Sequence, residues 1–425
     1  MKPIGLNIKN NVCYLGEHNL CDLALKYQTP LYIIDNQQLL KNISDYLTYF
    51  KSDKFETTVV YASKAFITYE FCKYLKNFNI SMDAVSLGDM FIASTAGFDL
   101  GRLVLHGNNK SLEELEYALK NHVGLIVVDN YYELTQLNNL TKDLNKEVNI
   151  LIRINPNIDA HTHKYIQTSN MESKFGVNIC DSKEINKMIT LIKTNSLINF
   201  KGIHAHIGSQ IFEKEAFILE SRKLIEFVNE LNNTYDLTLT TLNLGGGFGI
   251  KYLESDQGMS IPDMMKELVS FVEKELDKTN SLVNHLMIEP GRSIVGNAGI
   301  TLYKCSQIKK TYGKKQYLFI DGGMADNIRP ALYDAVYSVD VVNKMNSEKE
   351  VLVDVVGKCC ESGDIIRRDV LVPNISDQDI LMVYSTGAYN YTMSSNYNSL
   401  LRPAVLLVGE EVKVLKERQK LEDLI

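Results

Sequence analysis

The sequence is dominated by a regular alternation of short apolar or β-branched runs with stretches of helical character. The runs with strand character are, in chain order, Thr57–Ala62, Ser81–Val85, Arg102–His106, Gly124–Val128, Asn149–Ile154, Lys201–His206, Thr240–Leu244 and His285–Ile288. Eight strands that alternate with helices match a (β/α)8 barrel in number and in size. A doubly wound open sheet is the alternative that the alternation alone leaves open.

The stretches between these runs carry signals for helices. Ser111–Asn121 opens with a Ser-x-x-Glu pattern, which is typical of a capping box. Glu213–Tyr235 repeats apolar residues at helical spacing, and Pro262–Lys278 begins with a proline, which the first turn of a helix tolerates. These segments are therefore predicted to be barrel helices.

After about residue 297 the pattern changes to short strand-like runs separated by Gly, Asp and Asn. These runs are Leu302–Lys309, Gln316–Asp321, Glu350–Val356, Ile380–Val383 and Ala404–Val408. Near the N-terminus, Val12–Leu15 and Leu31–Ile34 are also strand-like, and we expect them to join the later strands. The predicted domains are therefore a barrel at 36–297 and a discontinuous β-rich domain formed by 1–35 and 298–425.

Composition excludes several functional classes. With 45% hydrophobic and 23% charged residues the chain is typical of a globular protein, and its net charge of −7 argues against a general nucleic-acid binder. No apolar run approaches the ~18 residues of a membrane span, and the N-terminus lacks the apolar core of a secretory signal. The seven cysteines are odd in number and contain no CxxC pair. We expect a reduced, cytoplasmic protein that binds neither nucleic acid nor membrane.

Chemically notable residues lie at the ends of the predicted strands. In a (β/α)8 barrel these ends converge on the face that holds the active site. The residues concerned include Lys64, Asp83, His206, Ser209, Gly245–Gly247, Glu289, Gly291 and Arg292. Their repeated position favours one shared site over a set of unrelated structural residues.

The three consecutive glycines favour an anion site. Gly245–Gly247 are followed by Phe248 and Gly249, so the GxGxxG fingerprint of dinucleotide binding is absent. Backbone N–H groups of such a run can form a nest for an anion, and barrels of this kind often build phosphate sites from the loops after strands seven and eight. A tight turn without a ligand is the simpler alternative. Ser209, expected on the same rim, favours a phosphate.

Lys64 directly follows the first predicted strand, in the segment YASKAF. Its amine is either exposed at a helix start or desolvated, and burial would lower its pKa and allow it to condense with an aldehyde. A phosphate site together with an aldehyde-reactive amine suggests pyridoxal 5'-phosphate (PLP).

Two His-x-His pairs, His161/His163 and His204/His206, raise the alternative of a metal site. Residues i and i+2 of a strand share a face and could chelate zinc. In metal-dependent amidohydrolases such a pair ends the first strand, whereas here it ends the sixth. We therefore expect no metal.

The ordered motifs resemble those of the diaminopimelate decarboxylase family, PLP enzymes of the alanine-racemase-like, fold-type III group. The resemblance runs from about Lys64 to Tyr397, and the ordered set is much more specific than any single motif. The motifs are YASKAF, HGNNKS, RINPN, HTHKYIQTSNMESKFG, HAHIGSQ, NLGGGFG, EPGRSIVGNAG, DGGMADNIRPALYDA, CCESGD and GAYNYTMSSNYN.

The resemblance implies roles for individual residues. Lys64 would bind PLP covalently until the substrate amine displaces it. His206 would stack on the cofactor ring, and Glu289 would pair with the pyridine nitrogen. The other implied cofactor-binding residues are Asp83, Ser209, Gly246, Gly247, Gly291, Arg292 and Tyr389. The implied substrate-binding residues are Arg292, Arg329, Tyr333, Glu361 and Tyr389. Cys360, as proton donor, and Glu361 would come from the other subunit of a homodimer. Asp89 stands where related enzymes often carry Glu.

The residue at position 289 bears on the type of reaction. A carboxylate keeps the pyridine nitrogen protonated and makes PLP a stronger electron acceptor, whereas family racemases carry Arg there. Glu289 therefore argues for decarboxylation, with Cys360 as general acid. Without the resemblance, Cys359 and Cys360 would be read as two small buried hydrophobic residues.

Arg292, Arg329 and Glu361 suit a substrate with a second amino-acid centre. The expected reaction is thus the conversion of meso-2,6-diaminopimelate to L-lysine and CO2, the last step of lysine biosynthesis. Decarboxylation of carboxynorspermidine, ornithine or arginine, or PLP binding without catalysis, remains as an alternative.

Overall fold

The computed structural model describes residues 2–158 and 173–425 and divides the chain into two compact units. The first, called here the barrel unit, comprises Ser44–Gly249 and Met259–Gly291. The second, called the β unit, comprises Met1–Ile43, Ile250–Gly258 and Arg292–Ile425. The metal candidates His161 and His163 lie outside the described residues.

In the part of the chain that the structure describes, the barrel unit contains a closed ring of eight parallel strands. They are β5 (Glu56–Tyr61), β6 (Ser81–Ala84), β7 (Leu103–Leu105), β8 (Leu125–Val128), β9 (Val148–Asn155), β11 (Ile198–His204), β12 (Thr241–Asn243) and β13 (His285–Ile288). The ring closes because β8 pairs with β9 and β13 pairs with β5. This confirms the predicted barrel and excludes an open sheet, whose end strands would each have one neighbour. The short β10 (Val177–Asn178) pairs with β9 beside the ring.

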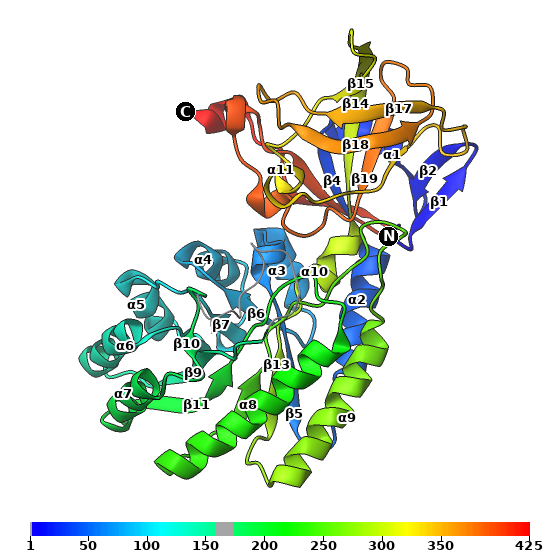
Figure 1. The fold of residues 1–425 in the computed structure, drawn as a ribbon. Helices are drawn as coiled ribbons and strands as arrows, with labels where there is room; N and C mark the ends of the chain where they lie inside the picture. Colours follow the sequence, from blue (N-terminus) through cyan, green and yellow to red (C-terminus); the bar gives the residue numbers. More distant parts are fainter. Residues whose placement is uncertain (1, 159–172) are drawn as a thin grey trace. The chain divides into compact units, whose positions relative to one another are not determined.

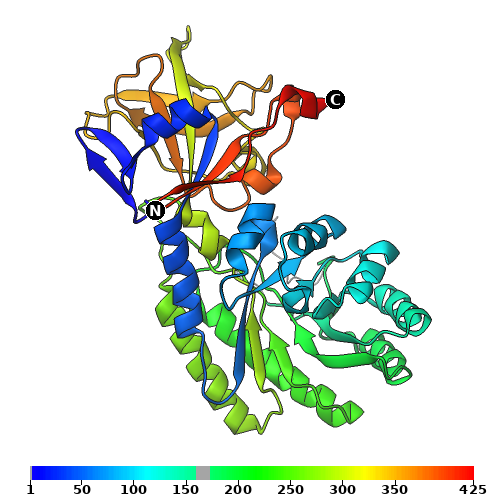
Figure 2. The same cartoon turned by 180° about the vertical axis from the view of Figure 1, so that it is seen from behind.

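Helices surround the strands, as Figures 1 and 2 show for the cyan to green part of the chain. They are α3 (Tyr69–Leu75), α4 (Leu87–Thr95), α5 (Leu112–Lys120), α6 (Tyr131–Leu144), α7 (Ser182–Lys193), α8 (Lys214–Tyr235) and α9 (Ile261–Thr279), while α2 (Asn36–Tyr49) precedes β5. The capping box predicted at Ser111 is present, because Ser111 and Glu114 bond reciprocally to each other's backbone. Among the described residues, every helix is too short or too polar to cross a bilayer.

Apolar side chains from five of the barrel strands pack together in one buried cluster. They are Val60, Val104, Val127, Leu151 and Met287. Burial of such a side chain stabilises the fold by about 1.5–3 kcal/mol. The polar residues at the strand ends are therefore carried by a packed scaffold.

The β unit is built on a sheet in the order β18-β17-β15-β14-β4-β20-β21, with β19 paired to β14 and β16 paired to β19. The strands are β4 (Leu31–Asp35), β14 (Gly299–Lys310), β15 (Gln316–Ile320), β16 (Val339–Val341), β17 (Val351–Val356), β18 (Ile365–Val372), β19 (Ile380–Tyr384), β20 (Ala404–Val408) and β21 (Val412–Lys416). Two short helices, α10 (Arg292–Val295) and α11 (Arg329–Tyr333), also belong to this unit.

The two N-terminal runs behave differently. Leu31–Asp35 lies between β14 and β20 and pairs with both, as predicted for Leu31–Ile34. Val12–Leu15 (β2) instead pairs with β1 (Leu6–Lys9) and β3 (His18–Asn19), although its Cys13 packs into the same core as Leu31. The helix α1 (Leu20–Tyr27) follows this small sheet.

Candidate active site

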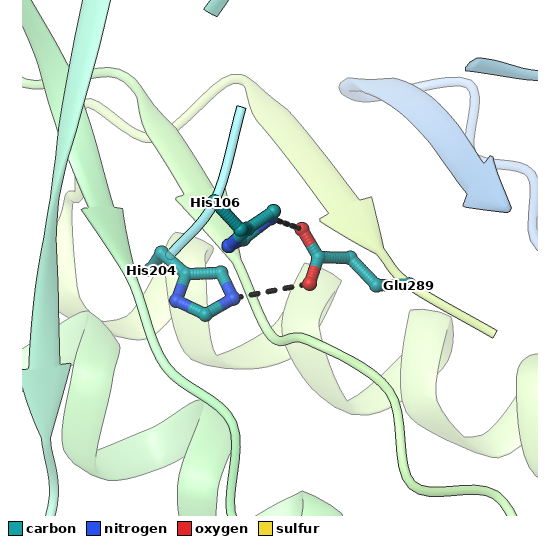
Figure 3. Close-up of side chains that lie close together, drawn as sticks. All are labelled: His106, His204 and Glu289. Carbon is teal, nitrogen blue, oxygen red and sulfur yellow. Dashed lines mark hydrogen bonds and ion pairs between the residues drawn. The ribbon is translucent and has the colours of Figure 1, made fainter. Parts of the chain in front are cut away.

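At the carboxyl end of the barrel strands, Glu289 follows β13 and is held by side chains from the ends of three other strands. His106 Nε2 lies 2.7 Å from Glu289 Oε1, and His204 Nε2 lies 3.1 Å from Oε2. Asn243 Nδ2 donates to Oε1 at 2.8 Å. Figure 3 shows the two imidazoles approaching the two oxygens of the carboxylate. Since β7, β11 and β12 supply these donors, the barrel ring itself fixes the orientation of Glu289.

The surroundings keep Glu289 ionised. Burial raises the pKa of this carboxyl, but the two histidines oppose burial through charge and hydrogen bonds, and the net pKa lies well below the usual range. Burial lowers the pKa of His204 to about 4. A neutral His204 still donates through Nε2, so at neutral pH its hydrogen bond, rather than its charge, stabilises the carboxylate.

The same three side chains could suggest a metal site, because one ligand atom from each lies within 4.8 Å of the others. Zinc bonds to nitrogen and carboxylate oxygen are about 2.0–2.2 Å long. The N···O distances of 2.7 and 3.1 Å are those of hydrogen bonds between the residues themselves. We therefore interpret His106, His204 and Glu289 as a hydrogen-bonded cluster.

His206 lies next to the glycine run. Its Nδ1 accepts a hydrogen bond from the Gly246 backbone N–H at 3.2 Å, which leaves the ring proton of a neutral imidazole on Nε2. Burial, followed by the charges of Lys64 and Arg153, lowers its pKa well below the usual range. His206 therefore offers a neutral ring, as the predicted stacking on a cofactor requires.

The loop at Gly245–Gly247, called here the glycine loop, has no room for a side chain at its second and third positions. A Cβ on Gly246 would lie 2.1 Å from the Glu289 carbonyl oxygen, and one on Gly247 would lie 2.4 Å from the Gly208 carbonyl oxygen. Gly245 and Gly247 also have φ values of 62° and 111°, which favour glycine. The glycines thus let this loop pack directly against neighbouring backbone where a phosphate was predicted, and a glycine loop of this kind fits a phosphate-bearing cofactor.

Lys64 and Asp83 occupy adjacent strand ends. Lys64 lies in the short 3-10 helix Ser63–Ala65 and is exposed, so of the two environments considered for it the structure has the exposed one. Asp83 is buried and accepts a hydrogen bond from the Ser63 backbone N–H at 2.6 Å. Burial raises the pKa of Asp83, and the charges of Lys64 and His106 oppose this rise. Lys64 therefore interacts electrostatically with both Asp83 and His206.

The positions of the other predicted residues of the barrel unit give less information about their roles. Ser209 is half-buried beyond β11. Gly291 packs closely against the first strand end, since a Cβ there would lie 2.8 Å from Ala62 Cβ. The Asp89 carboxylate accepts a hydrogen bond from the Val85 backbone N–H at 3.0 Å.

In the β unit, the predicted substrate-binding arginines share one partner. Arg292 and Arg329 are both buried, and each donates a hydrogen bond to the hydroxyl of Tyr252. The Arg292 guanidinium also lies 4.8 Å from the centre of the Tyr389 ring, and that of Arg329 lies 5.8 Å from the centre of the Tyr333 ring. The structure thus brings four predicted substrate-binding residues together around a residue that the sequence analysis missed.

The two adjacent cysteines differ in environment. Cys359 is buried, and burial raises the pKa of its thiol to about 11. Cys360 is exposed, and its backbone N–H donates to Asn398 Oδ1 at 2.7 Å. The reading of both cysteines as buried hydrophobic residues is therefore wrong for Cys360. Glu361 is also exposed.

Sequence reasoning noted the HGNNKS motif and the His204/His206 pair, but it did not connect His106, His204 or Asn243 with Glu289. His106, His204 and Asn243 each stand at or just beyond the end of a predicted strand, which is a signal that applied to them as much as to Glu289. Tyr252 follows the glycine run by five positions and carried no comparable signal.

Comparison with known proteins places these features in context. Residues 37–296 match the pyridoxal binding domain of pyridoxal-dependent decarboxylases. The diaminopimelate decarboxylase of Bacillus subtilis is 39% identical over 404 residues, which cover 95% of this chain and 92% of that protein. The structure of diaminopimelate decarboxylase from M. jannaschii in complex with L-lysine has a TM-score of 0.91 and 32% identity, covering 100% of this chain and 98% of the other. The Helicobacter pylori diaminopimelate decarboxylase complexed with L-lysine has a TM-score of 0.87 and 31% identity, covering 96% and 98%.

Proposed function

Because the chain belongs to the diaminopimelate decarboxylase family of PLP-dependent decarboxylases, we propose that it converts meso-2,6-diaminopimelate to L-lysine and CO2. The substrate assignment follows several relatives of this name at 38–40% identity over most of the chain. The observation that carries the chemistry is Glu289, a buried carboxylate kept ionised by donors from three barrel strands.

The residues proposed to hold the cofactor fit its chemical groups. Lys64 would bind the aldehyde carbon, and the glycine loop at Gly246 and Gly247, with Ser209, Gly291 and Arg292, would bind the phosphate. PLP supplies an acceptor for the electron pair that remains on the α-carbon when CO2 leaves. Glu289 would hold a proton at the pyridine nitrogen, His206 would cover the ring, and Asp83 and Tyr389 would complete the binding set.

Proton delivery and substrate binding are proposed to involve the β unit. Cys360 would donate the proton that replaces the lost carboxylate, since its thiol is exposed whereas that of Cys359 is buried. Arg292, Arg329, Tyr333 and Tyr389 would bind the substrate, with Glu361 toward the distal amine. We further propose that Cys360 and Glu361 act on the partner subunit's site in a homodimer.

The domain boundaries and the cellular location also belong with this proposal. We assign the cofactor-binding domain to residues 36–297 and the β-rich domain to 1–35 with 298–425, supported by the family match at 37–296. We also place the enzyme in the cytoplasm, since all seven cysteines are unpaired.

The test is a CO2-release assay with added PLP over a panel of amino acids. Diaminopimelate is expected to be the preferred substrate, and Lys64→Ala is expected to be inactive on every member of the panel. Preference for ornithine, arginine or carboxynorspermidine would overturn the substrate assignment. PLP binding without any CO2 release would instead support a non-catalytic relative.

A further inference from the structure

The hydroxyl of Tyr252 lies between two buried guanidinium groups. Its oxygen accepts hydrogen bonds from Arg292 Nη1 at 2.5 Å and from Arg329 Nη1 at 3.0 Å. The exposed fractions of the three residues are 8% for Tyr252, 6% for Arg292 and 7% for Arg329. Two cations thus converge on one phenol oxygen in a buried position, where uncompensated charge is costly.

The hydrogen bonds of the Arg329 guanidinium within the described residues go to phenol oxygens. The second acceptor is Tyr337 Oη, 2.7 Å from Arg329 Nη1. A neutral phenol compensates a guanidinium only partly, whereas carboxylates pair with arginine in strong charge-assisted geometry. The cluster of Tyr252, Tyr337, Arg292 and Arg329 is therefore suited to receive a carboxylate.

Tyr252 is held rigidly enough to position its partners. Its backbone N–H donates to Asp256 Oδ2 at 2.8 Å, and its carbonyl accepts from Ser338 Oγ at 3.0 Å. Its ring packs edge-on against Tyr337, with ring centres 5.3 Å apart. The backbone and the ring together fix the place at which the two arginines meet.

We propose that Tyr252 is a positioning residue that gathers Arg292 and Arg329 at one point and holds them ready for the substrate's distal carboxylate. The proposal rests on the proposed function, since it assigns the carboxylate to diaminopimelate. It makes Tyr252 a determinant of specificity, because ornithine and arginine carry no distal carboxylate for the gathered arginines to bind.

The charges around Tyr252 support this positioning role. The titratable groups that face it are Arg292, Arg329 and Tyr337, with Asp256 at its backbone. Burial raises the pKa of the phenol, but the two guanidiniums oppose burial more strongly, and the net pKa lies below the ordinary value. Tyr252 therefore ionises more readily than an ordinary tyrosine, and a phenolate oxygen would hold the two guanidiniums together more strongly than a phenol.

The kinetic test compares Tyr252→Phe with the wild-type holoenzyme. The variant keeps the ring and loses the oxygen, so KM for diaminopimelate is expected to rise about tenfold with kcat changed less than threefold, on the order of one lost charge-assisted contact. Tyr384→Phe is the matched control, because Tyr384 is a buried phenol of the same unit that bonds Asp340 at 2.7 Å. Its KM is expected to stay at the wild-type value.

A spectroscopic test does not depend on turnover. A pH titration of near-ultraviolet tyrosinate absorption, taken as wild type minus Tyr252→Phe, is expected to isolate one phenol that ionises below the others. The same difference with Tyr384→Phe is expected to show no such early transition. Absence of the early transition in the first difference, together with an unchanged KM, would overturn the proposal.

Tyr337→Phe keeps the test decisive if Tyr252→Phe does not fold. It removes one acceptor from Arg329 alone, so KM is expected to rise by a smaller factor, about threefold. An unchanged KM in a folded Tyr337→Phe enzyme would count against the cluster. If wild type releases no CO2 from diaminopimelate while the early tyrosinate transition is present, the proposed function fails and the charge arrangement at Tyr252 stands.

Discussion

His204 donates to Glu289 Oε2 through Nε2 at 3.1 Å, while its Nδ1 is buried and lacks a hydrogen-bond partner among the described residues. Protonation of Nδ1 would place a charge in a buried position without an acceptor, which agrees with the pKa of about 4 that burial gives this residue. The contact with Glu289 is therefore one of a neutral donor with a carboxylate.

Stability is expected to depend on His204 at mildly acidic pH. Between pH 4 and about 6.5 the unfolded chain binds a proton at this histidine that the folded protein does not, so stability rises with pH across this window. The contribution lost on acidification is roughly 3 kcal/mol. His204→Gln keeps an N–H donor but cannot titrate, and chemical denaturation at pH 4.5, 5.5 and 7 should show a shallower pH dependence for the variant. Equal pH slopes for both proteins would contradict the assignment.

Replacement of Glu289 by Gln is expected to lower kcat by about 100-fold or more, because the amide cannot keep a proton on the pyridine nitrogen. Gln is similar in size, so cofactor content measured by absorbance should change little. Glu70→Gln is a suitable control, since Glu70 forms an exposed ion pair with Lys73 on α3. Full activity of Glu289→Gln would remove Glu289 from the proposed mechanism.

In the glycine loop, a single added methyl group is predicted to lower both stability and cofactor content, whereas the same change elsewhere is not. Gly246→Ala would place a Cβ 2.1 Å from a backbone oxygen that has little room to move, at a cost of about 1–3 kcal/mol. Loss of bound PLP is also expected. At Gly313, in the turn between β14 and β15, an added Cβ would meet only Thr311 Oγ1 at 4.0 Å, so Gly313→Ala should behave like wild type in thermal unfolding and cofactor content. Equal unfolding temperatures and equal cofactor content in the two variants would contradict the role of Gly246 in the glycine loop.

Sharing of residues between subunits predicts complementation. Lys64→Ala and Cys360→Ala homodimers are each expected to be nearly inactive, Lys64→Ala through loss of the covalent cofactor link and Cys360→Ala through loss of the proton donor. Cofactor content should fall only in Lys64→Ala. If Cys360 serves the partner's site, mixing and reassembling the two variants should restore up to about one quarter of wild-type activity, because half the dimers are mixed and each has one intact site. Mixed dimers confirmed by differential tagging but still inactive would argue that each subunit supplies its own cysteine.

Much of the fold was predictable because each barrel strand is a short buried run bounded by helix signals. The strand predicted at His285–Ile288 has the same bounds in the structure. The capping box could be predicted from Ser111 and Glu114 alone. The pairing partner of Val12–Leu15 was harder to predict, because a strand-like run does not indicate which other strand it will pair with. Strand pairing depends on distant residues that propensity does not encode.

The candidate site was predictable to the extent that strand order determines which residues share a rim. Glu289 and His206 could be placed by counting strand ends, but their protonation could not, since it depends on donors from other strands and on burial. Tyr252 was missed because it stands outside the strand ends and becomes significant only through Arg292 and Arg329, 40 and 77 positions away in the sequence.

The hydrogen bonds to Glu289 also limit how this sequence can diverge. Both carboxylate oxygens are already engaged by side chains from separate strands, so shortening the acid to Asp would withdraw it from His106, His204 and Asn243 at once. An arginine there would direct its donors at the Nε2 atoms of two imidazoles, which can accept a hydrogen bond only after their protons move to Nδ1. Descendants that change one of these four positions are therefore expected to carry compensating changes at the others, and the four should vary as a linked set across evolution.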